Sequence, residues 1–221
     1  MVELAFDDRA LNMSETDTVA RILDAAEALF AERGFAETSL RTITSTAGVN
    51  LAAVNYHFGS KKELIQAVFA RFLTPFCQEL ERSLVKLIER KGSELTPEDL
   101  LDCLFSTICD GSEEGSYAAQ RFMRLLGLAY AQSQGHIRRF IIARYHKYYQ
   151  HFTGLLLKAA PGIDPVTFYW RLYFMLGATI FTLSSFDSIS EILKEDFGLD
   201  STLTGTTQMM VPALSGMFSV K

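Results

Sequence analysis

The segment from Thr38 to Lys62 contains the side chains best suited to bind an anion. It has three cations, Arg41, Lys61 and Lys62, and no Asp or Glu, although the whole chain has 26 acidic and 21 basic side chains. A carboxylate that faces a phosphate weakens binding by repulsion, whereas a cation that meets a phosphate releases a counterion. The net charge of -5 excludes a chain that is basic throughout but allows a local basic patch. We therefore predict that this segment contacts the backbone of a nucleic acid.

The sequence LAAVNYHF within this segment could read base edges. If Val54 faces inward on a helix, Ala52 and Ala53 lie on the far side, which is small and free of acids. Asn55, on its flank, can bridge N6 and N7 of adenine, and the alanines can touch thymine methyl groups. We expect half-sites that contain A·T pairs.

Other polar residues nearby are expected to hold phosphates. Tyr56 and His57 are assigned this role, although His57 could instead pack the turn as a partly buried ring. Asn50 could contact a base or cap the helix that follows it. The residues predicted to bind DNA are Thr38, Arg41, Asn50, Leu51, Ala52, Ala53, Asn55, Tyr56, His57, Lys61 and Lys62.

The two lysines lie in the first turn of a helix that Ser60 and Glu63 open as a capping box. Cations at this end oppose the helix dipole by roughly 0.3–1 kcal/mol each. A docked phosphate would meet both the lysines and the free backbone N–H groups, which would explain the arrangement. The alternative is a pair of solvated surface lysines.

Helices are the elements that would position these residues. Apolar residues recur at helical spacing from Val19, and Gly34 is expected to end that helix. A second helix is predicted over 39–47 with Thr38 as its N-cap, and Gly48 then breaks the chain before a third helix over 51–58. Two short helices joined by a turn with glycine are typical of a helix-turn-helix, whose second helix enters the major groove.

The remainder of the chain also has helical patterns and no strand pattern of useful length. The fold class predicted is all-α, with an N-terminal three-helix helix-turn-helix domain and a larger helical domain. The patterns fall at 97–109, 116–133, 136–159, 165–186 and 201–218. The predicted domains are a flexible arm over 1–15, a helix-turn-helix domain over 16–62 and the larger helical domain over 63–221.

The apolar run 166–186 requires a comparison with a membrane span. Arg171 interrupts it and no cluster of Lys or Arg follows, so we expect a helix buried on nearly all sides within protein. The acidic N-terminus differs from a signal peptide, and the three cysteines fit small apolar residues in a reducing cytoplasm. A cytoplasmic protein that does not bind a membrane is expected.

Catalytic motifs are absent from the sequence. It has no H-E-x-x-H, P-loop or G-x-S-x-G pattern, so no catalytic residue, metal site or cofactor is predicted. The alternative to a DNA-binding regulator is a helical enzyme or carrier in which the helix-turn-helix pattern is accidental.

The stretch VARILDAAEALFAERGFAETSLRTITSTAGVNLAAVNYHFGSKKELIQAVF resembles the DNA-binding region of TetR-type transcriptional repressors. The A-A-x-x-L-F-x-x-x-G-F block, the A-G-V turn and the Y-H-F-G-S-K pattern have the family's spacing, while Ala52 and Ala53 replace its usual Gly and Thr or Ser. The resemblance implies a homodimer on a palindromic operator, with recognition helices roughly 34–36 Å apart. It also implies a small effector in the larger domain and dimerisation through 165–186 and 201–218, where Gly177 and Ala178 would allow close approach.

The stretches FMRLLGLAYAQSQGHIRRF and FYWRLYFMLGA resemble a PsrA-type subgroup that responds to long-chain fatty acids. The effector implied is a fatty acid or acyl-CoA, and an aromatic drug-like compound is the alternative. Such a site should be mostly apolar with a few polar groups. The residues assigned to it are Arg124, Phe122, Tyr130, Tyr145, Arg171 and Phe174. Arg171, or else Arg124, would hold the carboxylate, unless Arg171 forms an ion pair with an acid of the protein.

Overall fold

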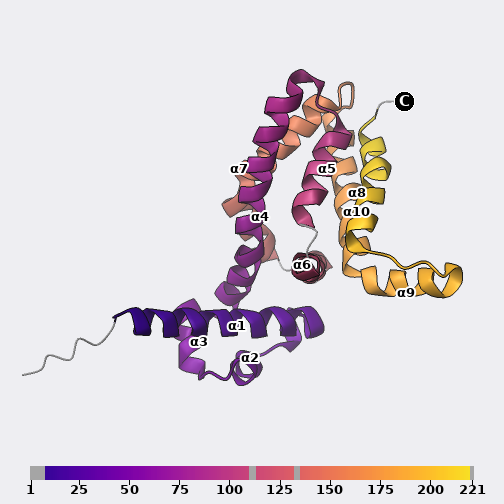
Figure 1. Ribbon diagram of the computed structural model, residues 1–221. Helices are drawn as coiled ribbons and strands as arrows, with labels where there is room; N and C mark the ends of the chain where they lie inside the picture. The colour runs from indigo at the N-terminus through magenta and orange to yellow at the C-terminus, as the bar shows by residue number, and fades with distance from the viewer. Residues whose placement is uncertain (1–7, 110–112, 132–134, 220–221) are drawn as a thin grey trace, which may run out of the picture. The chain divides into compact units, whose positions relative to one another are not determined.

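The computed structural model describes residues 8–109, 113–131 and 135–219 (Figure 1). These residues form ten α-helices and two 3₁₀ helices with no strand, which confirms the prediction of an all-α fold. The α-helices are α1 Asp8–Glu37, α2 Leu40–Ala47, α3 Leu51–Phe58, α4 Lys61–Lys91, α5 Pro97–Ile108, α6 Glu113–Ala131, α7 Gly135–Ala159, α8 Pro165–Ser184, α9 Phe186–Phe197 and α10 Leu203–Ser215, and the 3₁₀ helices are η1 Gly92–Glu94 and η2 Gly216–Phe218.

The chain divides into two compact units, Met1–Arg71 and Phe72–Lys221, with the boundary inside α4. The sequence placed its domain boundary earlier, between residues 62 and 63. Helix α1 begins at Asp8, so part of the segment 1–15 that was expected to be an arm is helical. Residues 1–7 lie outside the described part.

The first unit is held together by an apolar core beneath α2 and α3. Gly34, with φ 81° and ψ 169°, interrupts the helical geometry of α1, in agreement with the predicted end of a helix there. This break lets Phe35 turn back, so that its ring lies 5.3 Å from that of Phe30 and 6.2 Å from that of Phe69. The most deeply buried side chains are Ile22, Ala26, Phe30, Phe35, Ile43, Val54, Leu64 and Phe69.

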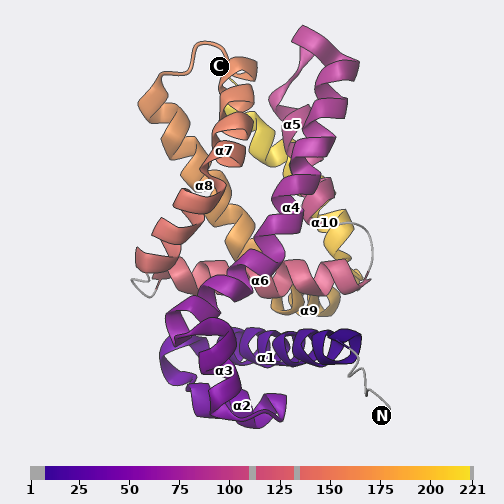
Figure 2. The same cartoon turned by 90° about the vertical axis from the view of Figure 1, so that its left-hand side faces the viewer.

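In the second unit α6 packs closely against α8, and α5 packs against α10. Figure 2 shows α6 crossing α7 and α8. A Cβ atom on Gly127 would lie 3.1 Å from Cγ2 of Ile180, so glycine permits the close approach of α6 and α8.

One face of α8 is apolar and exposed, which corrects the prediction of a helix buried on nearly all sides. Only 28% of its most apolar window is buried, and α8 is the single helix in the described ranges long and apolar enough to cross a membrane. Helix α6 covers one side, and the described chain leaves the other open. We call the open face the α8 stripe; it consists of Val166, Tyr169, Trp170, Tyr173, Phe174, Gly177 and Phe181.

Helix α9 was not predicted from the sequence. It buries none of its residues, and Figure 1 shows it extending away from the other helices of the second unit. Ile192 and Phe197 are 56% and 68% exposed. The helix therefore has an apolar side with little to cover it in its own chain.

The cysteines have the protected character expected of apolar residues. Burial raises the pKa of Cys77 to about 11, and burial followed by the charge of Asp102 raises the pKa of Cys103 to about 11. We expect these two thiols to react with a disulfide reagent at pH 7.5 far more slowly than in the chain unfolded by guanidinium, because only the thiolate is nucleophilic. The absorbance of the released reagent measures the reaction rate of the thiols. Equal rates in the folded and the unfolded chain would contradict the raised thiol pKa values.

Candidate nucleic-acid interface

Three caps fix both ends of α2 and the start of α3. Oγ of Ser39 accepts a hydrogen bond from the Thr42 amide at 3.0 Å, and Oδ1 of Asn50 accepts from the Ala53 amide at 2.9 Å. Gly48, with φ 65°, adopts the left-handed conformation that ends α2. The predicted cap at Asn50 is confirmed, whereas the prediction of Thr38 as the cap of α2 is wrong because Ser39 has that role.

Thr38 lies under the interface instead of on it. Its side chain is fully buried, and its hydroxyl donates to the carbonyl oxygens of Leu29 at 3.2 Å and Gly34 at 2.8 Å. A hydroxyl used in this way is not available to a phosphate. Thr38 therefore leaves the predicted set of DNA contacts and joins the end of α1 to the start of α2.

The substitution Thr38→Val tests this structural role. It keeps the shape of the side chain but leaves two carbonyl groups without their donor, which costs about 1–3 kcal/mol when the acceptors are buried. We expect urea denaturation to show that loss in the free energy of unfolding. If the stability is unchanged and DNA binding is weaker, Thr38 contacts DNA and does not have this structural role.

The open face of α3 has the composition that the sequence predicted. Val54 is fully buried, whereas Ala52, Asn55 and Tyr56 are exposed, Tyr56 by 77%. Ala53 is half-buried, and Leu51 is 38% exposed at the start of the helix. The structure thus brings small and amide side chains together, with Leu51 as a partly exposed aliphatic side chain at the start of the helix.

His57 is half-buried between two aromatic rings. Its ring centroid lies 4.9 Å from that of Tyr56 and 6.4 Å from that of Phe58. This environment favours the alternative in which His57 packs the turn, and it leaves Tyr56 as the more accessible of the two.

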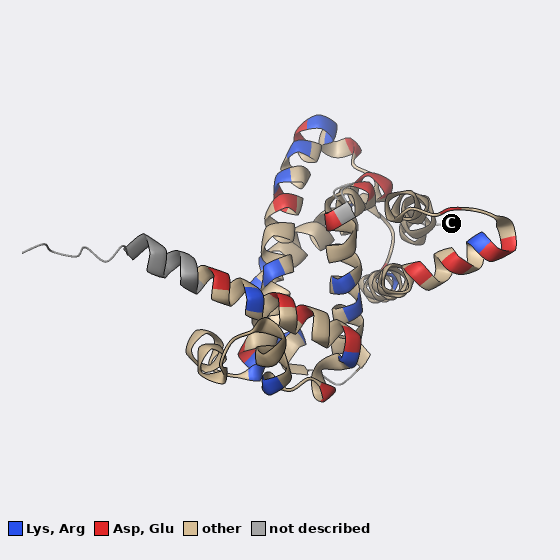
Figure 3. Ribbon diagram, turned by 60° about the horizontal axis from the view of Figure 1, so that its bottom comes forward, with Lys and Arg blue, Asp and Glu red and all other residues tan. Residues whose placement is uncertain are grey.

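Helices α2 and α3 themselves have no carboxylate, and the nearest acidic residues in the chain are the exposed Glu37 and Glu63. Figure 3 shows acidic residues along α1 and none on α2 or α3. Arg41 is exposed on α2, and Lys62 is exposed at the start of α4. Lys61 is half-buried, and its Nζ donates to the Ala36 carbonyl at 3.5 Å. Exposed cations thus lie on the helices that precede and follow α3 in the chain.

Ser60 caps α4 as predicted, but only half of the predicted capping box forms, because the Ser60 amide donates to the Phe58 carbonyl at 2.9 Å. The Ser60 hydroxyl accepts from the Glu63 amide at 3.2 Å and donates to the Glu63 carboxylate. The carboxylate is thereby held in the first turn, where it offsets the lysines beside it.

The double substitution Lys61→Ala and Lys62→Ala tests the phosphate contacts. Each lost contact lowers the slope of log Kd against log salt by about one, so we expect a decrease of up to about two per bound subunit. Fluorescence anisotropy at several salt concentrations measures the slope. If the slope stays unchanged, the lysines are solvated surface residues. Because Lys61 already bonds to Ala36, the single change at Lys62 should account for the larger share.

The residues assigned to an effector do not converge on one cavity. Phe122 is buried with its ring 4.1 Å from that of Phe72, and Tyr145 is buried with its hydroxyl 2.8 Å from Oγ1 of Thr74. Arg124 is exposed on α6. These placements put Phe122 and Tyr145 in the interior and Arg124 outside it.

The other three lie elsewhere. Arg171 donates to the carbonyl oxygens of Met217 and Ser219, and it has no ion-pair partner among the residues that the structure describes. Phe174 belongs to the α8 stripe and stacks on Trp170 with ring centroids 5.9 Å apart. Tyr130 is 44% exposed beneath the guanidinium of Arg138.

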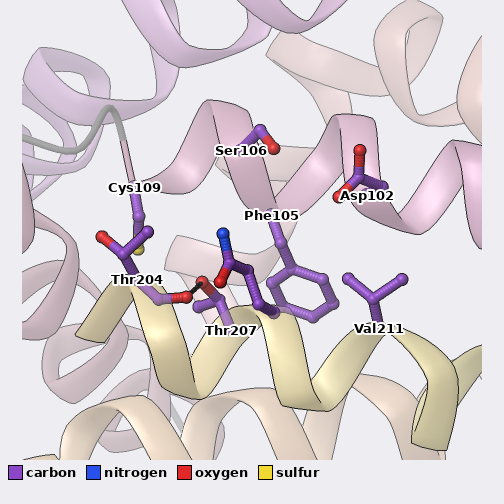
Figure 4. Close-up of a pocket in the computed structure, with 8 residues that line it drawn as sticks. Asp102, Phe105, Ser106, Cys109, Thr204, Thr207 and Val211 are labelled. Carbon is purple, nitrogen blue, oxygen red and sulfur yellow. Dashed lines mark hydrogen bonds between the residues drawn. The ribbon is translucent and has the colours of Figure 1, made fainter. Parts of the chain in front are cut away.

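A small cavity of about 230 Å³ lies between α5 and α10 (Figure 4). None of the residues assigned to an effector lines it. Its walls come from Asp102, Phe105, Ser106, Cys109, Thr204, Thr207, Gln208 and Val211. No local sequence pattern predicts this cavity, because the two segments that line it are far apart in the chain.

A three-helix unit with capped short helices and an exposed, carboxylate-free second helix defines a helix-turn-helix DNA-binding protein. Residues 22–68 match the family described as bacterial regulatory proteins, tetR family, and residues 102–217 match the tetracyclin repressor-like C-terminal domain. The chain belongs to the TetR family of transcriptional regulators. Its members are regulators and not enzymes, which removes the alternative of an accidental motif.

Similar proteins support this assignment. The HTH-type transcriptional repressor Rv3405c of Mycobacterium tuberculosis is 45% identical over 64 residues, which cover 29% of this chain and 34% of that protein. The regulator TtgR of Pseudomonas putida is 46% identical over 52 residues, 24% of this chain and 25% of that protein. The chain thus matches about a third or less of the length of these curated relatives.

Solved structures agree over a longer range. The fatty acid degradation regulator FadR from Bacillus halodurans has a TM-score of 0.58 at 17% identity, over 90% of this chain and 95% of that one. SmeT, the repressor of the Stenotrophomonas maltophilia multidrug efflux pump SmeDEF, has a TM-score of 0.52 at 23% identity, over 90% of each chain. At such identities the likeness shows the fold.

Proposed function

We propose that this protein is a homodimeric transcriptional repressor that binds a palindromic operator and is controlled by a small apolar effector. The observation that carries the DNA-binding role is the exposed face of α3, which has no acid and is flanked by Arg41 and Lys62. In a chain with 26 acidic residues, binding to phosphate explains why this face has none, because a carboxylate here would repel the DNA backbone.

The base contacts proposed come from a few side chains. Asn55 is exposed and bridges adenine N6 and N7, and Ala52 and Ala53 contact thymine methyl groups. Oδ1 of Asn50 is used by the Ala53 amide, so only its amino group is open to an acceptor on DNA. Tyr56 and the cations hold phosphates.

Dimerisation is proposed through the α8 stripe and the neighbouring surface of α10. Trp170, Phe174 and Phe181 are 59%, 57% and 65% exposed, and Met209 of α10 is 68% exposed. Isolated chains rarely expose an apolar surface of this continuity, which is typical of a protein interface. A Cβ atom on Gly177 would meet no atom within 4 Å, so the helix backbone is open to close approach there. We propose that a second copy of the chain covers this stripe, and the alternative is that the stripe contacts a membrane.

The effector is proposed to enter the interior of the second unit beside Phe122 and Tyr145. Phe122 stacks on Phe72 and Tyr145 lies beside Phe140, and the hydroxyl pair of Tyr145 and Thr74 offers a polar contact. A long-chain fatty acid or acyl-CoA is the first class and an aromatic drug-like compound the second. FadR is a regulator of fatty acid degradation and SmeT is the repressor of a multidrug efflux pump, and at their low identity neither decides between the two classes. Since Arg171 is bonded to backbone carbonyls, Arg124 is the remaining assigned cation for a carboxylate.

A mobility shift on the upstream region of the protein's own gene tests the function. We expect a complex with two chains per site at low salt, which a long-chain fatty acid, its acyl-CoA ester or an aromatic drug-like compound releases. A scrambled fragment of equal length is the control. Sedimentation with and without vesicles distinguishes a dimer from a membrane-bound monomer. A monomer that shifts no fragment would refute the proposal.

A further inference from the structure

Helix α9 combines exposed apolar and acidic side chains that its own chain leaves uncovered. Ile192, Phe197 and the following Leu199 are 56%, 68% and 59% exposed. Glu191 and Glu195 are exposed one helical turn apart, and neither has a hydrogen-bond or ion-pair partner in the described part of the chain. An amphipathic helix of this kind gains free energy by packing against a surface with apolar and cationic groups.

The second unit has such a surface at the corner where α6 leads to α7. Residues 115–163 contain seven Lys or Arg and no Asp or Glu. At the corner the guanidinium of Arg138 lies over the ring of Tyr130, 5.8 Å from its centroid, and Arg139 is exposed beside it. Ile142 is 67% exposed on α7. The corner also adjoins the α8 stripe. Burial raises the pKa of Tyr130, and Tyr173 of the stripe is close enough to raise it further.

Helix α9 extends away from its own copy of this corner. Asp187 in its first turn accepts a hydrogen bond from Gln120, at 3.5 Å, so α9 begins beside the N-terminal half of α6. The corner is at the C-terminal end of α6. Figure 1 shows α9 continuing outward on the side where α8 and α10 lie. In a dimer built on the α8 stripe, α9 therefore points toward the partner.

We propose that α9 is an arm that packs on the α6–α7 corner of a second copy of the chain, with its acidic residues facing the partner's Arg138 and Arg139. A two-fold axis along the α8 stripe exchanges the two sides of the molecule. An arm that starts beside the N-terminal half of one α6 thus reaches the C-terminal end of the other. The inference rests on the proposed dimer and extends its interface by a helix that the α8 and α10 contacts do not include.

A charge exchange between two variants tests the arm. One variant carries Glu191→Lys and Glu195→Lys, and the other carries Arg138→Glu and Arg139→Glu. Each homodimer then sets like charges against each other twice, so we expect its dissociation constant to rise roughly tenfold or more at low salt. In a mixture of the two variants both arms meet opposite charges again, and the heterodimer should return to within about threefold of the wild-type affinity.

Analytical ultracentrifugation of labelled chains measures these constants. The matched control is Glu89→Lys with Glu98→Lys, which makes the same charge change at exposed positions on α4 and α5 and should leave the dimer unchanged. If neither variant weakens the dimer, the proposed arm is wrong. It is also wrong if the variants weaken the dimer and the mixture does not restore the affinity, because the changed charges would then act within one chain. Circular dichroism checks that the variants are folded.

Hydrogen exchange provides a second measurement that needs no charge change in the arm. Amides of residues 186–200 should exchange at least about tenfold more slowly in the wild-type dimer than in a chain made monomeric by Gly177→Glu. Equal exchange would overturn the arm while leaving the dimer in place. A wild-type chain that is monomeric would refute the proposed dimer itself, so the two failures are distinguishable.

Discussion

The variant Ala52→Glu is expected to lose DNA binding while its fold stays intact. Ala52 is exposed in the first turn of α3, where a carboxylate favours the helix dipole by roughly 0.3–1 kcal/mol. The same carboxylate faces base edges and phosphates when α3 lies in the groove. At about 1–3 kcal/mol for each recognition helix, a dimer loses roughly 30-fold or more in affinity.

Anisotropy at low salt measures the affinity, and thermal unfolding measures the fold. Ala143→Glu on α7 is the control, because it adds the same side chain at an exposed helical position outside the first unit. We expect normal binding by the control and an unchanged or higher midpoint of unfolding for Ala52→Glu. Retained affinity in Ala52→Glu would mean that α3 does not enter the groove.

The variant Gly177→Glu is expected to dissociate the dimer. Gly177 lies on the exposed side of α8, so a larger side chain meets no atom of its own chain within 4 Å. Replacing glycine inside a helix even adds helix propensity, roughly 0.5–1 kcal/mol. In the dimer the new carboxylate would be buried among apolar residues of two α8 stripes. We expect a monomer at micromolar concentration. Operator binding should also weaken, because the helix-turn-helix units of the two chains are no longer linked.

Gly154→Glu is the matched control for this prediction. Gly154 is also inside a helix, α7, and a Cβ atom there also meets nothing within 4 Å. This control should remain a dimer. Ultracentrifugation distinguishes the two variants, and a dimer that survives Gly177→Glu would place the interface away from α8.

The sequence predicts the helix-turn-helix well because its signals are local. Gly48 and Asn50 mark a left-handed residue and a cap within one turn of the helices that they bound. The error at Thr38 arises because two neighbouring hydroxyls can each cap α2. Only the position of the Leu29 and Gly34 carbonyls decides that Thr38 turns inward and leaves the cap to Ser39.

The second unit is less predictable because its apolar residues serve two purposes. The residues around Trp170 would make a helix apolar on nearly all sides. The periodicity of the sequence therefore does not reveal which side packs against α6 and which side remains exposed. The same limit hides α9, none of whose apolar residues is buried by the described part of the chain. Arg171 suggests a binding site in the sequence, whereas in the fold it bonds to backbone carbonyls that are distant in the chain.

Selection of duplexes from a random pool tests the central claim most directly, because it needs no knowledge of the operator. We predict enrichment of an inverted repeat whose halves contain A·T pairs and whose centres lie about 10–10.5 base pairs, or a multiple of this, apart. Enrichment should disappear with Ala52→Glu, and Gly177→Glu should lose the repeat. A pool that stays random with the wild-type chain, or that yields an unrepeated site, would contradict a carboxylate-free α3 presented twice by one dimer.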